Sequence, residues 1–428
     1  MSIDSCDSGF SGGRVHRIRL AATPISFALK VSPEGQSVAR WHEVAGELAK
    51  AMAEPPDAWS DVPDLDDVPN RIRLDAPVST DISSTHLDAA NVGRDSPRPL
   101  NSGLLAAPIP TADGRWIVSE QGRHWQCTAW VDGKACDDSE AIDALTGPRA
   151  LVLGGEAIAR LHARLSTLPA PVACSGELPR CFRDRLQRLQ ELRPWLSSGS
   201  LLRERLPSTT AQWCALLERC VLDRGGDSFC LQRNQSGYQK LAQRMMSATE
   251  RMVSQGDTIH RLLTSELQQH LQTAPAAWRQ AWVLRDIHRE HILFDTSRER
   301  VTGIIDHDAM DWDCPVVDLV RWAGSFPVQL EQQSATTRLG WAVEGYNRIA
   351  SANHEQGLAD GPRARSFFVK SPTPEELALG ETLLRLNAWV GMANWVDWIG
   401  LRRRVFFSSP EALSNRISGL IDSVCHFC

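Results

Sequence analysis

The chain has 428 residues, of which 42% are hydrophobic and 23% charged, and its formal net charge is −6. This is the composition of an ordinary globular protein of two or three lobes, and its mildly acidic balance argues against a nucleic-acid-binding surface. No apolar run approaches the roughly 20 residues that a membrane helix needs, so we expect no membrane partner.

The eleven cysteines are an odd number and are scattered along the chain. No signal peptide precedes them, which predicts a reducing, cytoplasmic setting with free thiols. Cys425 and Cys428 are spaced like half of a zinc site. Since no second pair has zinc-finger spacing, an accidental spacing is the better interpretation.

The N-terminal segments have the pattern of β-structure followed by one helix. Residues 14–20 alternate as a strand, and residues 26–31 form a second strand after the Thr23-Pro24 break. Residues 37–52 then carry apolar side chains at helical spacing. This predicts a small sheet with one helix at the start of the chain.

Residues 54–100 interrupt this pattern. They contain seven prolines and nine aspartates, and their apolar residues are isolated. Too little apolar surface is present to offset the entropy of ordering, so we expect a disordered or loosely held insertion. Strands are expected again at 115–119 and 124–131, joined by a hairpin turn at Gln121-Gly122.

From residue 132 onward the chain is mainly helical, with a few short strands. Helical periodicity is clearest at 154–165 and 374–398, and strand-like runs return at 282–284, 291–294 and 301–305. This order predicts an α+β protein-kinase-like two-lobe fold. A small N-terminal β-sheet lobe with one helix (1–131) would precede a larger, mainly helical C-terminal lobe (132–428).

Two acidic residues follow short apolar strands in the segment V-L-R-D-I-H-R-E-H-I-L-F-D, residues 283–295, and in V-T-G-I-I-D-H-D, residues 301–308. Asp286 follows the first strand, and Asp306 ends the last one. Phosphoryl transfer needs one carboxylate to orient the attacking hydroxyl and another to hold Mg²⁺ against the nucleotide phosphates. The pattern therefore indicates phosphotransferase chemistry.

This region resembles the aminoglycoside phosphotransferase/choline kinase family, whose catalytic loop reads H-G-D-x-H-x-x-N-I-L. The resemblance implies that Asp286 is the catalytic aspartate and His288 the second histidine of the loop. Asp306 falls on the metal-binding aspartate of the family, and Asp318 on a structural acid that braces the loop. It also implies ATP as donor, Mg²⁺ or Mn²⁺ as metal, and a small-molecule acceptor with a hydroxyl or amine.

Three positions depart from the motif of the family. Leu284 replaces its first histidine, Arg285 replaces its glycine, and His291 replaces the asparagine that ligates metal. Imidazole is a weak ligand for Mg²⁺ and a better one for Mn²⁺ or Zn²⁺. His291 is therefore either a metal ligand beside Asp306, with Asp308 as another candidate ligand, or a structural histidine.

The phosphate side of the expected nucleotide site depends on a rare lysine. Only five of the 46 basic residues are lysines, and Lys30 ends the strand F-A-L-K, where the family places the lysine that contacts the α- and β-phosphates. Glu43 and Glu47 lie one helical turn apart downstream, and the family spacing favours Glu47 as the partner of Lys30. Glycines Gly9, Gly12 and Gly13 are expected to form the phosphate loop through backbone amides.

The segment Trp130-Val131-Asp132-Gly133 resembles the hinge between the two lobes of the family, and its backbone groups are expected to hydrogen-bond adenine. Farther along, Trp395 and Trp398 share a helix face, either as core residues or as a stacking wall for a substrate.

Two other functions stay open at this point. One is a kinase-fold pseudoenzyme that binds nucleotide or metabolite without efficient catalysis, which the change at His291 favours. The other is a helical binding protein without nucleotide, which would make the matches at Lys30, Asp286 and Asp306 coincidental. Neither the acceptor nor the oligomeric state is evident from the sequence.

Overall fold

The computed structural model describes the chain in fifteen ranges. The described residues are 2–6, 14–19, 26–33, 45–46, 48–49, 104–120, 123–136, 146–171, 178–197, 200–222, 234–273, 278–326, 334–359, 369–404 and 410–425, with the last residues of the chain and the expected insertion at 54–100 outside them.

The N-terminal part is an antiparallel sheet with strand order β1-β2-β3-β6-β4, and β5 pairs with β6 beside it. The strands are β1 (Ser2–Cys6), β2 (Arg14–Arg19), β3 (Ser26–Pro33), β4 (Pro108–Ile109), β5 (Ile117–Glu120) and β6 (Arg123–Ala129). The strands expected from alternation are thus confirmed. In addition, the five-residue strand β1 precedes the expected glycine loop.

The expected helix at 37–52 is described at Ala45, Gly46, Leu48 and Ala49, which are helical. Ala45 is buried against Ile117, with Trp116 packed beside them. The helix therefore covers the sheet through a small apolar contact.

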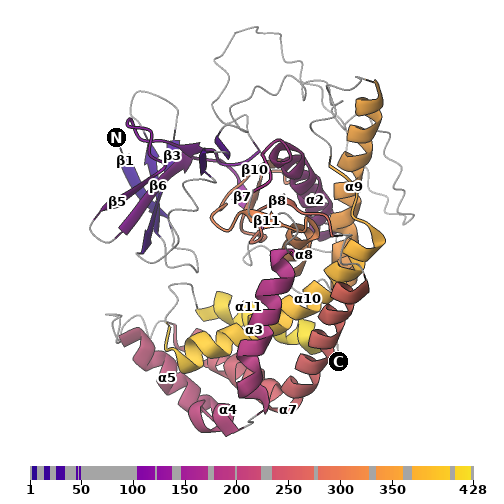
Figure 1. Ribbon diagram of the computed structural model, residues 1–428. Coiled ribbons are helices and arrows are strands. Elements are labelled where there is room, and N and C mark those ends of the chain that lie inside the picture. Colours follow the sequence, from indigo (N-terminus) through magenta and orange to yellow (C-terminus); the bar gives the residue numbers. More distant parts are fainter. Residues whose placement is uncertain are drawn as a thin grey trace, which may run out of the picture.

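Short strands connect the sheet to the helical part of the chain. Strand β7 (Lys134–Ala135) pairs with β9 (Ile292–Phe294), which pairs with β10 (Val301–Ile304), and β8 (Ala281–Val283) pairs with β11 (Asp311–Asp313). Residues 130–133 join β6 to β7. Gly133 is required in this link because a Cβ there would come closer than 3.0 Å to the Phe294 carbonyl. Figure 1 shows these short strands between the sheet and the helices.

The C-terminal part is mainly helical, as expected. Its helices are α2 (Thr146–Leu165), α3 (Arg180–Ser197), α4 (Ser200–Arg205), α5 (Thr210–Leu222), α7 (Gln235–Thr273), α8 (Val316–Gly324), α9 (Ala335–Ala359), α10 (Pro374–Trp395), the π-helix η4 (Val396–Leu401) and α11 (Pro410–Cys425). The helix expected at 374–398 is therefore α10 continued into η4. A capping box at its start, between Thr373 and Glu376, explains where it begins.

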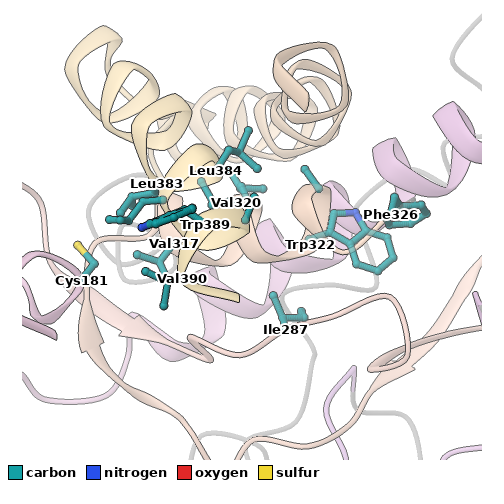
Figure 2. Packing of buried hydrophobic residues seen from close by; sticks show 14 of the residues in the cluster. Cys181, Ile287, Val317, Val320, Trp322, Phe326, Leu383, Leu384, Trp389 and Val390 are labelled. Carbon is teal, nitrogen blue, oxygen red and sulfur yellow. The ribbon is translucent and has the colours of Figure 1, made fainter. Parts of the chain in front are cut away.

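One large apolar core holds these helices together, and α8 lies near its centre. Figure 2 shows Val317 and Val320 of α8 packed among Leu383, Leu384 and Trp389 of α10. Trp395 is also buried, at 4% exposure, which supports its interpretation as a core residue. No helix among the described residues is both long and apolar enough to cross a membrane.

Helices α2 and α9 pack unusually closely because glycines face the contact. A Cβ on Gly155 would approach the Ala342 carbonyl, and one on Gly345 the Val152 carbonyl, both closer than 3.0 Å. Close packing of backbones needs such residues. This contact brings His162 of α2 next to Tyr346 of α9, and both support the loop that follows β8.

Candidate functional site

The loop that carries Asp286 is held in place by one buried carboxylate. Asp318, at the start of α8, accepts hydrogen bonds from the backbone N–H of Leu284 (2.8 Å) and of Arg285 (2.6 Å). His162 Nε2 donates to the same carboxylate at 2.9 Å, and Tyr346 lies 3.0 Å from His162 Nδ1. Asp318 is fully buried, so it braces the loop, as the sequence suggested.

Arg285 stands where the family has glycine, and its backbone explains why glycine suits that position. Its φ is +65°, in the left-handed region, which costs a residue with a side chain about 1–2 kcal/mol. The guanidinium donates to Asp184 of α3 at 2.5 Å and to Asp313 of β11 at 3.1 Å. These charged contacts offset the backbone strain and hold α3 against the loop.

Asp286 lies between two nitrogen-bearing side chains. Arg321 Nη2 donates to its Oδ1, and His288 Nε2 lies 3.0 Å from the same oxygen. Burial alone would raise the pKa of Asp286, but the Arg321 charge and the His288 contact together hold that pKa well below its usual range. Asp286 is therefore an anionic hydrogen-bond acceptor that can orient a hydroxyl.

His288 is a neutral imidazole at neutral pH. Burial and the nearby Arg321 charge lower its pKa to about 4, even though Asp286 opposes this shift. Its ring meets that of His291 edge-on, with 5.4 Å between centroids. This environment suits a group that braces the loop better than one that carries a proton at neutral pH.

The side chain of Lys30, on β3, extends to Asp306 and Asp308, the two acidic residues that follow β10. Its Nζ lies 2.7 Å from Asp306 Oδ1 and 2.5 Å from Asp308 Oδ2. Burial would lower the pKa of Lys30, but the two carboxylates raise it overall, so the amine is charged. Gln126, its direct partner on β6, donates to Asp308 Oδ1 at 2.9 Å.

His291 connects the two catalytic candidates. Its Nδ1 lies 2.9 Å from the carbonyl oxygen of Asp286, which can only accept, so Nδ1 carries the proton. Its Nε2 lies 3.6 Å from Asp306 Oδ2. Burial would raise the pKa of Asp306, but the charge of Lys30 lowers it, so the carboxylate that faces Nε2 is an anion.

His291 and Asp306 would hold a divalent cation, because an imidazole nitrogen and a carboxylate oxygen, both common metal ligands, lie 3.6 Å apart here. Mg²⁺ is commonly held by one or two protein groups together with substrate phosphates. Among the described residues no three His, Cys, Asp or Glu side chains are disposed around one metal position, so Asp308 does not complete a preformed three-ligand set.

Several expected nucleotide-binding residues lie outside the described residues, namely Gly9, Gly12, Gly13 and Glu47. At the hinge, the backbone N–H of Trp130 already donates to the Ser26 carbonyl at 3.1 Å. The guanidinium of Arg17 lies 4.5 Å from the centre of the Trp130 ring. Adenine recognition would thus fall to other backbone groups around Val131.

Two residues of the site were missed by sequence reasoning. Arg321 follows Asp318 by three residues on α8, and this spacing places both side chains toward the loop. That signal was available in the sequence. Gln126 meets Asp308 only because β6 pairs with β3 in this register, which local patterns do not reveal.

Three solved phosphotransferase structures resemble the chain at low sequence identity. An aminoglycoside phosphotransferase from Alicyclobacillus acidocaldarius has a TM-score of 0.42 at 10% identity, covering 99% of this chain and 92% of that one. Macrolide 2'-phosphotransferase MphH from Brachybacterium faecium gives 0.40 at 12% identity, with 97% and 92% covered. Spectinomycin phosphotransferase APH(9)-Ia, solved with ADP and spectinomycin, gives 0.40 at 9% identity, with 98% and 92% covered.

No curated protein sequence matches the chain significantly. The model of the phosphotransferase enzyme family, APH, matches residues 84–350. This range is more than half of the chain and contains both Asp286 and Asp306, although Lys30 precedes it. The chain has the α+β protein-kinase-like fold, with an antiparallel N-terminal sheet and a mainly helical C-terminal part, and belongs to the APH phosphotransferase family.

Proposed function

We propose that this protein transfers the γ-phosphoryl group of ATP to a hydroxyl or amine of a small molecule. The observation that carries the proposal is a continuous chain of contacts from Lys30 through Asp306 and His291 to Asp286. In this proposal Lys30 contacts the phosphates, Asp306 and His291 hold the divalent metal, and Asp286 orients the hydroxyl. Phosphoryl transfer requires these parts.

Asp286 would accept the hydrogen bond of the acceptor hydroxyl and take its proton as the oxygen bonds to phosphorus and ADP leaves. Its lowered pKa makes it a weak base, which fits a loose transition state in which proton transfer comes late. His288 and Arg321 would hold its carboxylate in one orientation.

Lys30 would contact the α- and β-phosphates. An ammonium group has three donors, and two of them are directed at Asp306 and Asp308 in this structure, which leaves one for phosphate. Asp306 and His291 would hold Mg²⁺ or Mn²⁺, which neutralises phosphate charge when bound. Glu47 and the glycines Gly9, Gly12 and Gly13 remain proposed parts of the nucleotide site, as do the hinge residues Trp130 and Val131.

A second candidate is a pseudoenzyme that binds nucleotide or metabolite without efficient catalysis. Its specific support is the direct bond from Arg321 to Asp286, which occupies one oxygen that the acceptor would need. The histidine at position 291 adds to this support. The other Asp286 oxygen makes no bond that we can assign among the described residues, so the geometry still allows a hydroxyl to bind.

The test is nucleotide binding and ATP turnover against pooled hydroxyl- and amine-bearing metabolites, with Mg²⁺ and with Mn²⁺. Asp306→Asn should abolish metal-dependent nucleotide binding, whereas Asp286→Asn should keep binding and reduce turnover at least about 100-fold. Equal loss of nucleotide binding in both variants would contradict the assigned roles. Nucleotide binding without turnover in the wild type would favour the pseudoenzyme.

A further inference from the structure

Four arginines from four different elements lie around the loop that carries Asp286. We call them the arginine cluster: Arg185 of α3, Arg285 of the catalytic loop, Arg321 of α8 and Arg416 of α11. Arg321 bonds Asp286 directly, and Arg285 bonds Asp184, the neighbour of Arg185. These two contacts bring α3 and α8 to adjacent residues of the loop.

Three members of the cluster have carboxylate partners. Arg285 has Asp184 and Asp313, Arg321 has Asp286, and Arg416 Nη1 lies 3.8 Å from Glu290. The charges of three of the four arginines are therefore neutralised by nearby carboxylates, and within the described part of the chain the charge of the fourth is not.

Arg185 is this fourth arginine. Among the described residues its guanidinium makes no ion pair, and its hydrogen bond runs from Nε to the neutral Asn387 Oδ1 at 2.9 Å. Burial together with the charges of Arg321 and Arg285 lowers its pKa to about 10, so it stays protonated at neutral pH. A partly exposed cation that lies near other cations, without a carboxylate partner of its own, is stabilised by binding an anion.

Arg321 also has donors to spare. Its Nε is buried and lacks a hydrogen-bond partner among the described residues, while its Nη2 is shared between Asp286 and His288. A carboxylate or phosphate accepts two parallel bonds from such a guanidinium. Binding an anion here would also weaken the hold of Arg321 on the Asp286 oxygen that a hydroxyl must approach.

We propose that the acceptor carries an anionic group, a carboxylate or a phosphate, which Arg185 and Arg321 bind beside Asp286. This inference rests on the proposed phosphotransferase function and names its substrate class. A polycationic acceptor is disfavoured at this position, because its charges would lie beside the guanidinium of Arg185, which no carboxylate of the described residues neutralises.

The experiment compares three probes with one carbon skeleton: glycerol, glycerate and glycerol 3-phosphate, which are neutral, carboxylate-bearing and phosphate-bearing. Binding to the full-length protein is measured by calorimetry, without nucleotide and with a non-hydrolysable ATP analogue. We expect at least one anionic probe to bind about tenfold or more tightly than glycerol. The stronger of the two identifies the carboxylate or the phosphate as the group bound.

Arg185→Gln should weaken binding of that probe by about 10- to 100-fold, and Arg185→Lys should restore part of it. The matched control is Arg188→Gln, on the same face of α3. Arg188 already donates to Asn394 at 2.7–2.9 Å and lies 3.5 Å from Asp397, so its loss should leave probe affinity within about twofold. The Lys variant keeps the test informative if the Gln variant fails to fold.

The inference is overturned if glycerol binds as well as both anions, if an aminoglycoside such as kanamycin binds more tightly than either, or if Arg185→Gln and Arg188→Gln behave alike. Its failure differs from failure of the proposed function. Arg185-dependent anion binding without any nucleotide binding would reject the kinase proposal alone. ATP turnover on a neutral or cationic acceptor, unchanged in Arg185→Gln, would reject the anionic acceptor alone.

Discussion

Replacing Asp318 by Asn tests whether one carboxylate holds the catalytic loop. Asp318 uses two oxygens to accept from the N–H groups of Leu284 and Arg285, and it also accepts from His162. Asparagine has a single acceptor oxygen, and its NH₂ would face a donor. One backbone N–H would therefore lose its partner in a fully buried position.

The size of the effect follows from these bonds. Loss of a hydrogen bond to a charged group costs about 1.5–3 kcal/mol, and a buried N–H left unsatisfied adds about 1–3 kcal/mol. We expect Asp318→Asn to lower the free energy of unfolding by about 3–5 kcal/mol. Tyr346→Phe, which removes only the outer hydroxyl bond to His162, should cost about 1 kcal/mol.

The assay is urea denaturation at pH 7, with the denaturant slope compared between variants, together with amide hydrogen exchange. The amides of Leu284 and Arg285 should exchange faster in Asp318→Asn than in Tyr346→Phe. The reasoning is refuted if Asp318→Asn lies within about 1 kcal/mol of the wild type, or if both variants cost the same.

Three further predictions concern packing, pH and metal preference. Gly345→Ala drives a Cβ into the Val152 carbonyl and should cost about 3 kcal/mol, whereas Gly340→Ala on the same helix, with open space around it, should be neutral or stabilising in urea unfolding. The pKa of His288 falls from 6.5 unfolded to about 4 folded, so stability is full above pH 6.5 and lost toward pH 4. The loss should be about 2 kcal/mol between pH 7 and 5, and His288→Gln should remove that slope if the histidine is its source. His291→Asn should shift metal preference in nucleotide binding from Mn²⁺ toward Mg²⁺, and an unchanged preference would make His291 structural.

Much of the fold was predictable because its signals are local. Alternation marked β2, β3, β5 and β6 but not β1 or β4, and helical spacing marked α2 and α10. Asp286 and Asp306 were singled out because each follows a short apolar strand, and Asp318 was singled out by its resemblance to the family motif.

The remainder depends on contacts between distant segments. The bond from Gln126 to Asp308 spans 182 residues, and the one from Lys30 to Asp306 spans 276. The isolated cation Arg185 is unusual only because α3 docks beside α8 through Asp184 and the loop. No periodicity in the sequence encodes that docking, so the arrangement of these arginines became visible only in three dimensions.

The three departures from the family motif bear on whether the site is catalytic. Each of the three residues makes contacts that hold the loop in place. Leu284, in place of histidine, is buried in the core at 1% exposure. Arg285 carries a left-handed backbone that would suit glycine, and two aspartates hold its guanidinium. His291 directs Nε2 at Asp306 by donating from Nδ1 to Asp286. The residues that differ from the motif therefore still help to hold Asp286 and Asp306 in fixed positions. A binding scaffold with no need of these two aspartates would have no reason to hold them so, and this favours catalysis over the pseudoenzyme.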